Sequence, residues 1–225
     1  MTEPAYLHDI RTSYDTVAES YAEIVPPSFE KWTMGRALLA AFAELVNTEG
    51  GGAPVVDMGC GPGHVTARLH ALGVDAYGVD LSPGMIEVAR RNHPELRFEV
   101  GSMTEPLDLP DDGLGGVLAL YSFIHLPSDV LPAVFAEFHR VLTPGGHLML
   151  GFHVGDTSVR KKSGYGGHPM SIDVHRMLPD RIADVVTQAG LLEHTRVVEQ
   201  PELGNERSSA TACLLFRKPG SPTRP

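Results

Sequence analysis

The feature that most constrains the fold is a glycine-rich stretch at residues 55–66. It opens with two valines and Asp57, and an apolar pattern with helical spacing begins at Val65. Three glycines stand between them at alternate positions: Gly59, Gly61 and Gly63. A β-branched run, a glycine turn and a helix start are typical of a strand–turn–helix unit. Because glycine lacks a Cβ, such a turn lets a ligand approach the main chain, so we expect a nucleotide-binding α/β unit here.

The kind of ligand follows from the acids on either side of the turn. Asp80 lies 23 residues after Asp57, at the end of a second apolar stretch over residues 74–79, where a carboxylate can accept hydrogen bonds from ribose hydroxyls. The glycine spacing of a dinucleotide site is absent because His64 occupies its third position, and there is no P-loop motif. Asp57 would repel a pyrophosphate and attract an ammonium group. The sequence therefore predicts an adenosine ligand without phosphates that carries an amine.

With these motifs in order, the chain resembles the class I S-adenosylmethionine-dependent methyltransferases, particularly those that act on small molecules. The matching segments are residues 57–63, residues 79–82 with Met85 after them, and residues 140–146 before a strand. The likeness extends from about Tyr14 to about Phe216. It implies an α/β, Rossmann-like fold with a seven-stranded, mostly parallel sheet in the order 3-2-1-4-5-7-6. The resemblance also implies helices on both faces and an antiparallel terminal strand, whereas the residues alone indicate five parallel strands and a terminal pair.

The resemblance further implies S-adenosylmethionine as the cofactor, together with the residues that contact it. Tyr14 and Tyr21 are expected near the methionine group, in an N-terminal helix that either closes over the cofactor or only packs on the domain. Met85 is expected against the adenine or in the core. Ser102 stands where many family members carry an acid for the adenine amino group, and the Met103 backbone is the alternative. The expected cofactor residues are Tyr14, Tyr21, Asp57, Gly59, Cys60, Gly61, Asp80, Leu81, Met85, Gly101, Ser102, Met103, Leu120 and Tyr121.

The composition disfavours several classes of protein. With 18 basic and 28 acidic residues, a net charge of -10 and no long basic run, a nucleic-acid substrate is not expected. The longest apolar stretch, residues 114–126, is interrupted by glycines and polar residues, so we expect no membrane span. Two cysteines and an N-terminus without signal-peptide features favour a reducing, cytoplasmic location. Cys60 is interpreted as a packing residue rather than a reactive thiol, and we expect no metal site.

The chain length fits one domain over residues 1–218, with a helical lid region at 1–48, an α/β core at 53–218 and a disordered tail at 219–225. The first helix is expected over residues 8–24, ended by Pro26 and Pro27. Ser82 is a natural N-cap with Pro83 at the first helical position, which predicts a helix over residues 83–92. Residues 155–175 show little periodicity, which predicts a long functional loop. Further strands are expected at 96–100, 116–122, 147–153, 191–199 and 209–218.

Candidate reacting groups lie at the carboxyl ends of the expected strands, where open α/β sheets bind ligands. His125 follows the fourth strand and His153 ends the fifth, so both are candidate catalytic residues. Tyr165 and His168, in the long loop, are expected to form part of the acceptor pocket. A sulfonium already activates its methyl group, so positioning is the main requirement, and a general base is needed only for a protonated acceptor.

Three functions stay open on the sequence alone. The leading one is a methyltransferase that methylates oxygen, nitrogen or carbon of a small molecule, of the kind found in secondary metabolism. The second is a non-methylating enzyme on the same fold, and the third is a non-catalytic module that binds the cofactor. The oligomeric state, monomer or homodimer, is open as well.

Overall fold

The structure is a computed structural model that describes residues 3–201 and 209–220. Residues 221–225 of the expected tail, and residues 202–208 between the last two expected strands, lie outside the described residues. Among the described helices, none has the length and hydropathy needed to cross a membrane.

The core of the fold is a seven-stranded sheet in the order β3-β2-β1-β4-β5-β9-β8. Its strands are β1 Val55–Met58, β2 Ala76–Asp80, β3 Phe98–Val100, β4 Leu114–Leu120, β5 Leu142–His153, β8 Leu192–Glu199 and β9 Thr211–Arg217. β9 runs antiparallel to both of its neighbours, and the pairs from β3 to β5 are parallel. Since β8 and β9 are the sixth and seventh strands of this sheet, the predicted fold class and the order 3-2-1-4-5-7-6 are confirmed.

Helices cover both faces of the sheet. They are α1 Ala5–Lys31, α2 Thr33–Glu49, α3 His64–Ala71, α4 Pro83–Asn92, α5 Leu131–Val141 and α6 Pro179–Gln188, with a short 3-10 helix, η1 Phe123–His125. Phe42 of α2 and Leu69 of α3 belong to one buried cluster, and Phe138 of α5 and Val186 of α6 to another. β4 lies between the two clusters and is buried at nearly every residue, as its continuous apolar sequence predicts for a central parallel strand.

The predicted start of α4 is confirmed in detail. Ser82 is the N-cap, its hydroxyl accepts a hydrogen bond from the Met85 backbone N–H at 3.0 Å, and Pro83 is the first helical residue. Such a cap satisfies an N–H that has no partner within the helix. It also places the first turn of α4 directly after Asp80.

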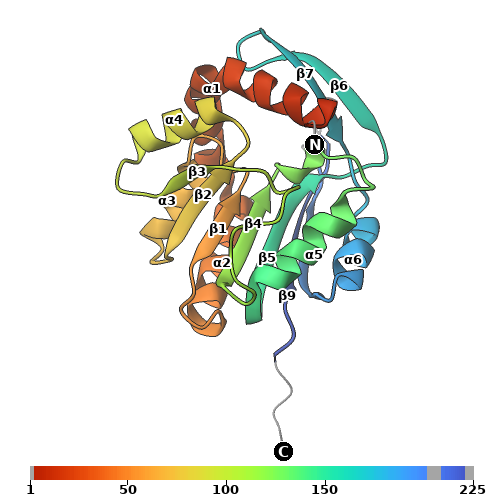
Figure 1. The fold of residues 1–225 in the computed structure, drawn as a ribbon. Coiled ribbons are helices and arrows are strands. Elements are labelled where there is room, and N and C mark those ends of the chain that lie inside the picture. Colours follow the sequence, from red (N-terminus) through yellow and green to blue (C-terminus); the bar gives the residue numbers. More distant parts are fainter. Residues whose placement is uncertain (1–2, 202–208, 221–225) are drawn as a thin grey trace, which may run out of the picture.

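The predicted end of the first helix is wrong. α1 continues through Pro26 and Pro27 to Lys31. Each proline removes one helical N–H. However, Phe29 in the following turn is only 9% exposed and packs in the buried cluster that contains Phe42 and Leu69. This burial holds the last turn in place, and α1 extends as one long helix across the carboxyl ends of the strands (Figure 1).

The long loop predicted over residues 155–175 is also wrong, because this segment forms a two-stranded hairpin. β6 Ser158–Gly164 pairs antiparallel with β7 His168–His175, and the hairpin lies beside α1 (Figure 1). β7 buries every second residue, Met170, Ile172 and Val174, whereas β6 is exposed along most of its length. An exposed strand has no alternating pattern to detect, and the short alternation in β7 was the available signal.

Candidate active site

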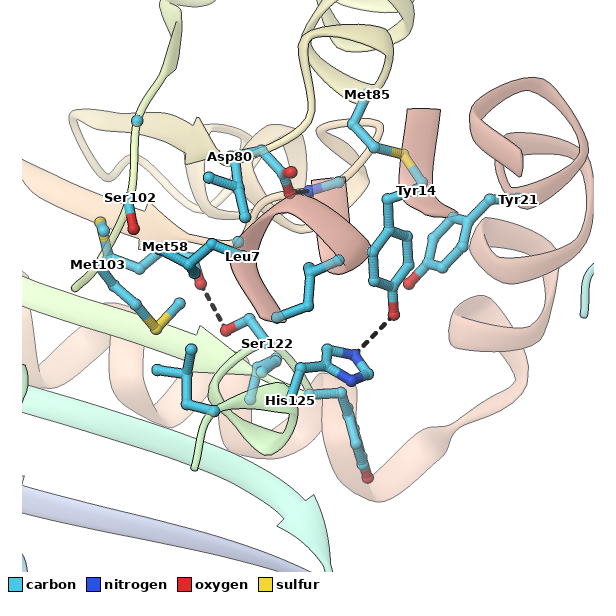
Figure 2. A pocket seen from close by; sticks show the side chains of 18 residues that line it. Leu7, Tyr14, Tyr21, Met58, Asp80, Met85, Ser102, Met103, Ser122 and His125 are labelled. Carbon is cyan, nitrogen blue, oxygen red and sulfur yellow. Dashed lines mark hydrogen bonds between the residues drawn. The ribbon is translucent and has the colours of Figure 1, made fainter. Parts of the chain in front are cut away.

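A cavity opens at the carboxyl ends of β1, β2 and β4, beneath α1 (Figure 2). The cavity together with its solvent-filled mouth has a volume of about 670 Å³. Most of the expected cofactor residues line it: Tyr14, Tyr21, Gly59, Gly61, Asp80, Leu81, Met85, Gly101, Ser102, Met103, Leu120 and Tyr121. The candidate catalytic residue His125 lines it as well.

The glycines of the turn after β1 have different surroundings. Gly59 and Gly61 both have positive φ angles, 80° and 53°. A Cβ on Gly59 would lie 2.2 Å from the Cβ of Ser122, so its backbone is pressed against the end of β4. A Cβ on Gly61 would meet only the Tyr21 ring, at 3.7 Å. The main chain at Gly61 is therefore the part of the turn that stays open to a ligand.

Asp80 is held by the turn that it faces. Its Oδ2 accepts a hydrogen bond from the Gly61 N–H at 2.8 Å (Figure 2), and its Oδ1 accepts one from the Ser82 N–H at 2.9 Å. Burial raises the pKa of this carboxyl to about 6. A carboxylate has about four lone-pair sites, so two remain for hydroxyl groups of a ligand in the cavity.

Asp57 and Cys60, also expected to bind the cofactor, line a second cavity of about 750 Å³. The two cavities share four lining residues and so adjoin: Tyr21, Gly59, Leu120 and Tyr121. Asp57 is 2% exposed and accepts a hydrogen bond from the Thr66 hydroxyl at 2.7 Å. Burial, and secondarily the charge of Asp80, raise the pKa of Asp57 to about 7. Burial also raises the pKa of the Cys60 thiol well above its usual value, which disfavours a reactive thiolate.

Tyr14 and His125 join the lid helix to the end of β4. The Tyr14 hydroxyl lies 2.8 Å from His125 Nε2 (Figure 2), and His125 Nδ1 lies 2.8 Å from the backbone oxygen of Asp173 in β7. A carbonyl oxygen only accepts, so Nδ1 carries the proton and Nε2 accepts from Tyr14. Burial lowers the pKa of His125 to about 4, so the ring is neutral at pH 7.

The other three expected site residues line neither cavity. His153 lies at the end of β5, with its ring centroid 5.0 Å from that of Tyr121. Tyr165 lies in the hairpin turn, with its ring 4.6 Å from that of Tyr21. His168 is exposed at the start of β7.

Five residues that line the first cavity are not among the site residues expected from the sequence: Leu7, Ile10, Met58, Ser122 and Leu126. Leu7 and Ile10 lie on the buried face of α1, and the helical spacing of its apolar residues was the available signal. Ser122 donates from its hydroxyl to the Met58 backbone oxygen at 2.6 Å, a contact that no sequence motif announces (Figure 2). Ser102, in contrast, was expected, and its hydroxyl is 2.8 Å from that of Thr104.

Comparison with known proteins identifies the domain. A family model described as a methyltransferase domain matches residues 55–146. Malonyl-(acyl-carrier protein) O-methyltransferase of Hahella chejuensis is 30% identical over 149 residues, which cover 65% of this chain and 53% of that protein. The chain spans about half or less of the length of the first curated relatives, 37% and 53%.

Solved structures share the fold over nearly the whole chain. Magnesium protoporphyrin IX methyltransferase from Synechocystis PCC 6803, solved with bound S-adenosylmethionine, has a TM-score of 0.69, with 13% identity over 97% of this chain and 99% of that one. The (4+2)-cyclase SpnF has a TM-score of 0.70, with 17% identity over 98% of this chain and 99% of that one. Residues 55–146 thus match the model of a methyltransferase domain, and the chain shares its fold with S-adenosylmethionine-dependent methyltransferases of known structure. The resemblance in the sequence is confirmed.

The residues present fit S-adenosylmethionine. The turn at Gly61 leaves its main chain open, and the Asp80 carboxylate has lone pairs for the two ribose hydroxyls. Met85 and Met103 line the same cavity and offer apolar surface to an adenine ring. Asp57, in the adjoining cavity, offers a carboxylate to an ammonium group.

Proposed function

We propose that this protein transfers a methyl group from S-adenosylmethionine to a small-molecule acceptor. The observation that carries the proposal is the Asp80 carboxylate, held by the Gly61 and Ser82 amides at the mouth of the glycine turn. This arrangement suits a ribose, and the charge of Asp57 before the turn disfavours phosphates there. The net charge of -10 supports a small acceptor rather than a nucleic acid.

The chain's own residues would bind and orient the two reactants. Asp80 holds the ribose, Asp57 attracts the amino group, and Met85 and Met103 pack on the adenine. The bound cofactor supplies a methyl group on a sulfonium. The protein then has mainly to hold the acceptor atom in line with that group, an effect worth up to roughly 7–11 kcal/mol.

α1 is the proposed lid, and the Tyr14–His125 hydrogen bond is its latch. Because Nε2 of His125 is occupied by Tyr14 and the pKa of the ring is about 4, the ring is a weak base. We therefore assign His125 a positioning role: its ring holds the hydroxyl of Tyr14 on the lid helix. His153 lies farther from the cavity, beside Tyr121, and its catalytic role stays a prediction.

A non-methylating enzyme is the second candidate, and the likeness to the cyclase SpnF favours keeping it. A non-catalytic binding module is the third. Purified protein incubated with methyl-labelled S-adenosylmethionine and a panel of acceptors separates them. We expect a labelled methylated product that disappears in Asp80→Ala. Conversion of an acceptor without label transfer would indicate the second function, and cofactor binding without any turnover the third.

A further inference from the structure

The hairpin turns one lysine toward the acceptor side of the cavity. In the β6–β7 register Lys161 lies directly opposite Ile172. Directly paired residues of an antiparallel ladder project from the same face of the sheet. Ile172 is 1% exposed and packs in the same buried cluster as Phe138 and Val186, to which Leu7 and Ile10 of α1 also belong. The Lys161 side chain therefore projects from the inner face of the hairpin, while remaining accessible.

The surroundings of Lys161 belong to the proposed active site. Its Nζ lies 5.9 Å from the centroid of the Tyr165 ring, which packs on Tyr21, a residue of both cavities. Its charge also acts on both candidate histidines: after burial, it is among the causes that lower the pKa of His125 and of His153. Arg176, just after β7, is a further cause of the lowered pKa of His153. Lys161 thus acts on the residues that follow β4 and end β5, and Arg176 acts on the residue that ends β5.

The two cations have no ion-pair partner among the residues that the structure describes. Arg160, next to Lys161, pairs with Asp9 at 2.8 Å and with Asp173 at 2.9 Å. No carboxylate in residues 3–201 and 209–220 lies within ion-pair distance of Lys161 or Arg176. The rings placed near Lys161, those of Tyr165, His125 and His153, are uncharged at pH 7. In a chain with 28 acids and 18 basic residues, two cations at this place without an ion-pair partner among the described residues are suited to bind an external anion.

We propose that the methyl acceptor is a small organic acid whose anionic group is bound by Lys161, assisted by Arg176. The inference rests on the proposed function and names the substrate class of that same site. Lys161 is then a specificity-determining residue, because it attracts anionic acceptors and provides no such attraction for uncharged analogues. The attraction works in the same direction as the sulfonium, whose positive charge also favours an anion beside it.

The test uses pairs of an anionic probe and an uncharged analogue: benzoate with benzamide, succinate with succinamide, and phenyl phosphate with phenol. Each is titrated by calorimetry into the full-length protein saturated with S-adenosylhomocysteine, and each is offered as a methyl acceptor. The variants are Lys161→Met, Arg176→Met and the conservative Lys161→Arg. Lys162→Met is the matched control, because Lys162 is the next residue, has the same charge and is exposed. The phosphate pair tells whether a carboxylate or any anion is accepted.

We expect an acid to bind at least about tenfold more tightly than its neutral partner in the wild-type protein, with weaker binding at high salt. Lys161→Met should remove most of this preference, Lys161→Arg should restore it, and Lys162→Met should leave it unchanged. Equal binding of acids and neutral partners, or a preference that survives Lys161→Met, would overturn the inference. Affinity for S-adenosylhomocysteine alone is measured in parallel: if the wild-type protein does not bind it, the proposed function itself has failed.

Discussion

At the scale of single residues, substitutions at two glycines with positive φ can distinguish an effect on folding stability from an effect on ligand binding. Gly61 and Gly73 both have positive φ, 53° and 81°, and neither would place a Cβ closer than 3.7 Å to another atom. Gly61 lines the cavity, and Gly73 follows α3 away from it. Gly59 is unsuited to this comparison because any side chain there strikes Ser122.

Gly61→Ala and Gly73→Ala should each lower the free energy of unfolding by about 1 kcal/mol, because alanine is strained at positive φ. Only Gly61→Ala should also weaken binding of S-adenosylhomocysteine, by at least about tenfold, since its methyl group enters the ligand's side of the turn. Denaturant unfolding and calorimetry on both variants check this. Equal affinities in the two variants would mean that the turn is not the cofactor cradle.

The latch is a second prediction at this scale. Tyr14→Phe removes the hydroxyl that donates a hydrogen bond to His125 Nε2. The loss of a hydrogen bond of this kind costs about 1–3 kcal/mol. We expect S-adenosylhomocysteine to dissociate about tenfold faster in stopped-flow measurements, because the lid opens more readily. Tyr6→Phe, on the same helix but lining neither cavity, is the control. An unchanged dissociation rate in Tyr14→Phe would rule out the latch.

At the scale of elements, the parts that could be predicted are those with a local cause. Ser82 and Pro83 define the start of α4 because capping acts within one turn. The β6–β7 hairpin was missed because β6 contacts little of the core and its pairing partner lies across a turn. α1 continues past Pro26 and Pro27 because Phe29 is buried by residues distant in the sequence. Tertiary contacts decided both elements, and the only single-segment pattern that reports either of them is the short alternation in β7.

The same distinction applies within the site. The positions of Asp80 and the glycine turn follow from motif spacing, and the structure brings them together. The partner of Tyr14 could not be read from the sequence, because the hydrogen bond joins residues 111 positions apart. His153 ends β5 as predicted, but its ring packs against Tyr121, and Tyr165 packs against Tyr21, so neither lines a cavity and their roles stay predictions.

The hairpin turn supplies a prediction for an element. The Gly167 N–H donates to the Gly164 backbone oxygen at 3.2 Å, and Tyr165 and Gly166 have φ of 45° and 93°. Positive φ at both central positions defines a type I′ turn, where asparagine is preferred and tyrosine is strained. Tyr165→Asn should therefore keep or raise the melting temperature. Because it removes the ring that packs on Tyr21, it should lower turnover at least about tenfold while cofactor affinity stays within about threefold. Turnover at the wild-type rate would show that the hairpin tip is not part of the acceptor pocket.

At the scale of the whole molecule, two buried carboxyls make the ligand-free protein sensitive to pH. The pKa of Asp57 is raised from 3.8 to about 7 by burial and by the nearby charge of Asp80. Between these two values the folded state holds a proton that the unfolded chain releases. The contribution of Asp57 to stability is therefore greatest at low pH and is lost as the pH rises through about 7. A positively charged ligand offsets this loss by stabilising the ionised carboxylates.

Comparing the thermal stability of Asp57→Asn with that of the wild-type protein should reveal this pH-dependent contribution of Asp57. Relative to the wild-type protein, the ligand-free variant should become progressively more stable as the pH rises from 5 to 8, because it has no carboxyl to ionise. Taking the difference cancels the histidines, including His125, that titrate in the same range in both proteins. A difference that is flat with pH, or that falls, would show that Asp57 is already ionised at low pH in the folded state.

The most direct test of the central claim is calorimetric titration of S-adenosylhomocysteine into the wild-type protein and Asp80→Ala at pH 8. The account predicts one site in the wild-type protein, and a loss of roughly 2–4 kcal/mol in Asp80→Ala, because two hydrogen bonds to a charged group disappear. Asp75→Ala, an exposed acid before the other end of β2, should bind like the wild-type protein. Affinity in the wild-type protein should fall as the pH drops through about 6, where Asp80 gains a proton in the free protein. A wild-type protein that does not bind, or a folded Asp80→Ala that binds equally well, would contradict the account.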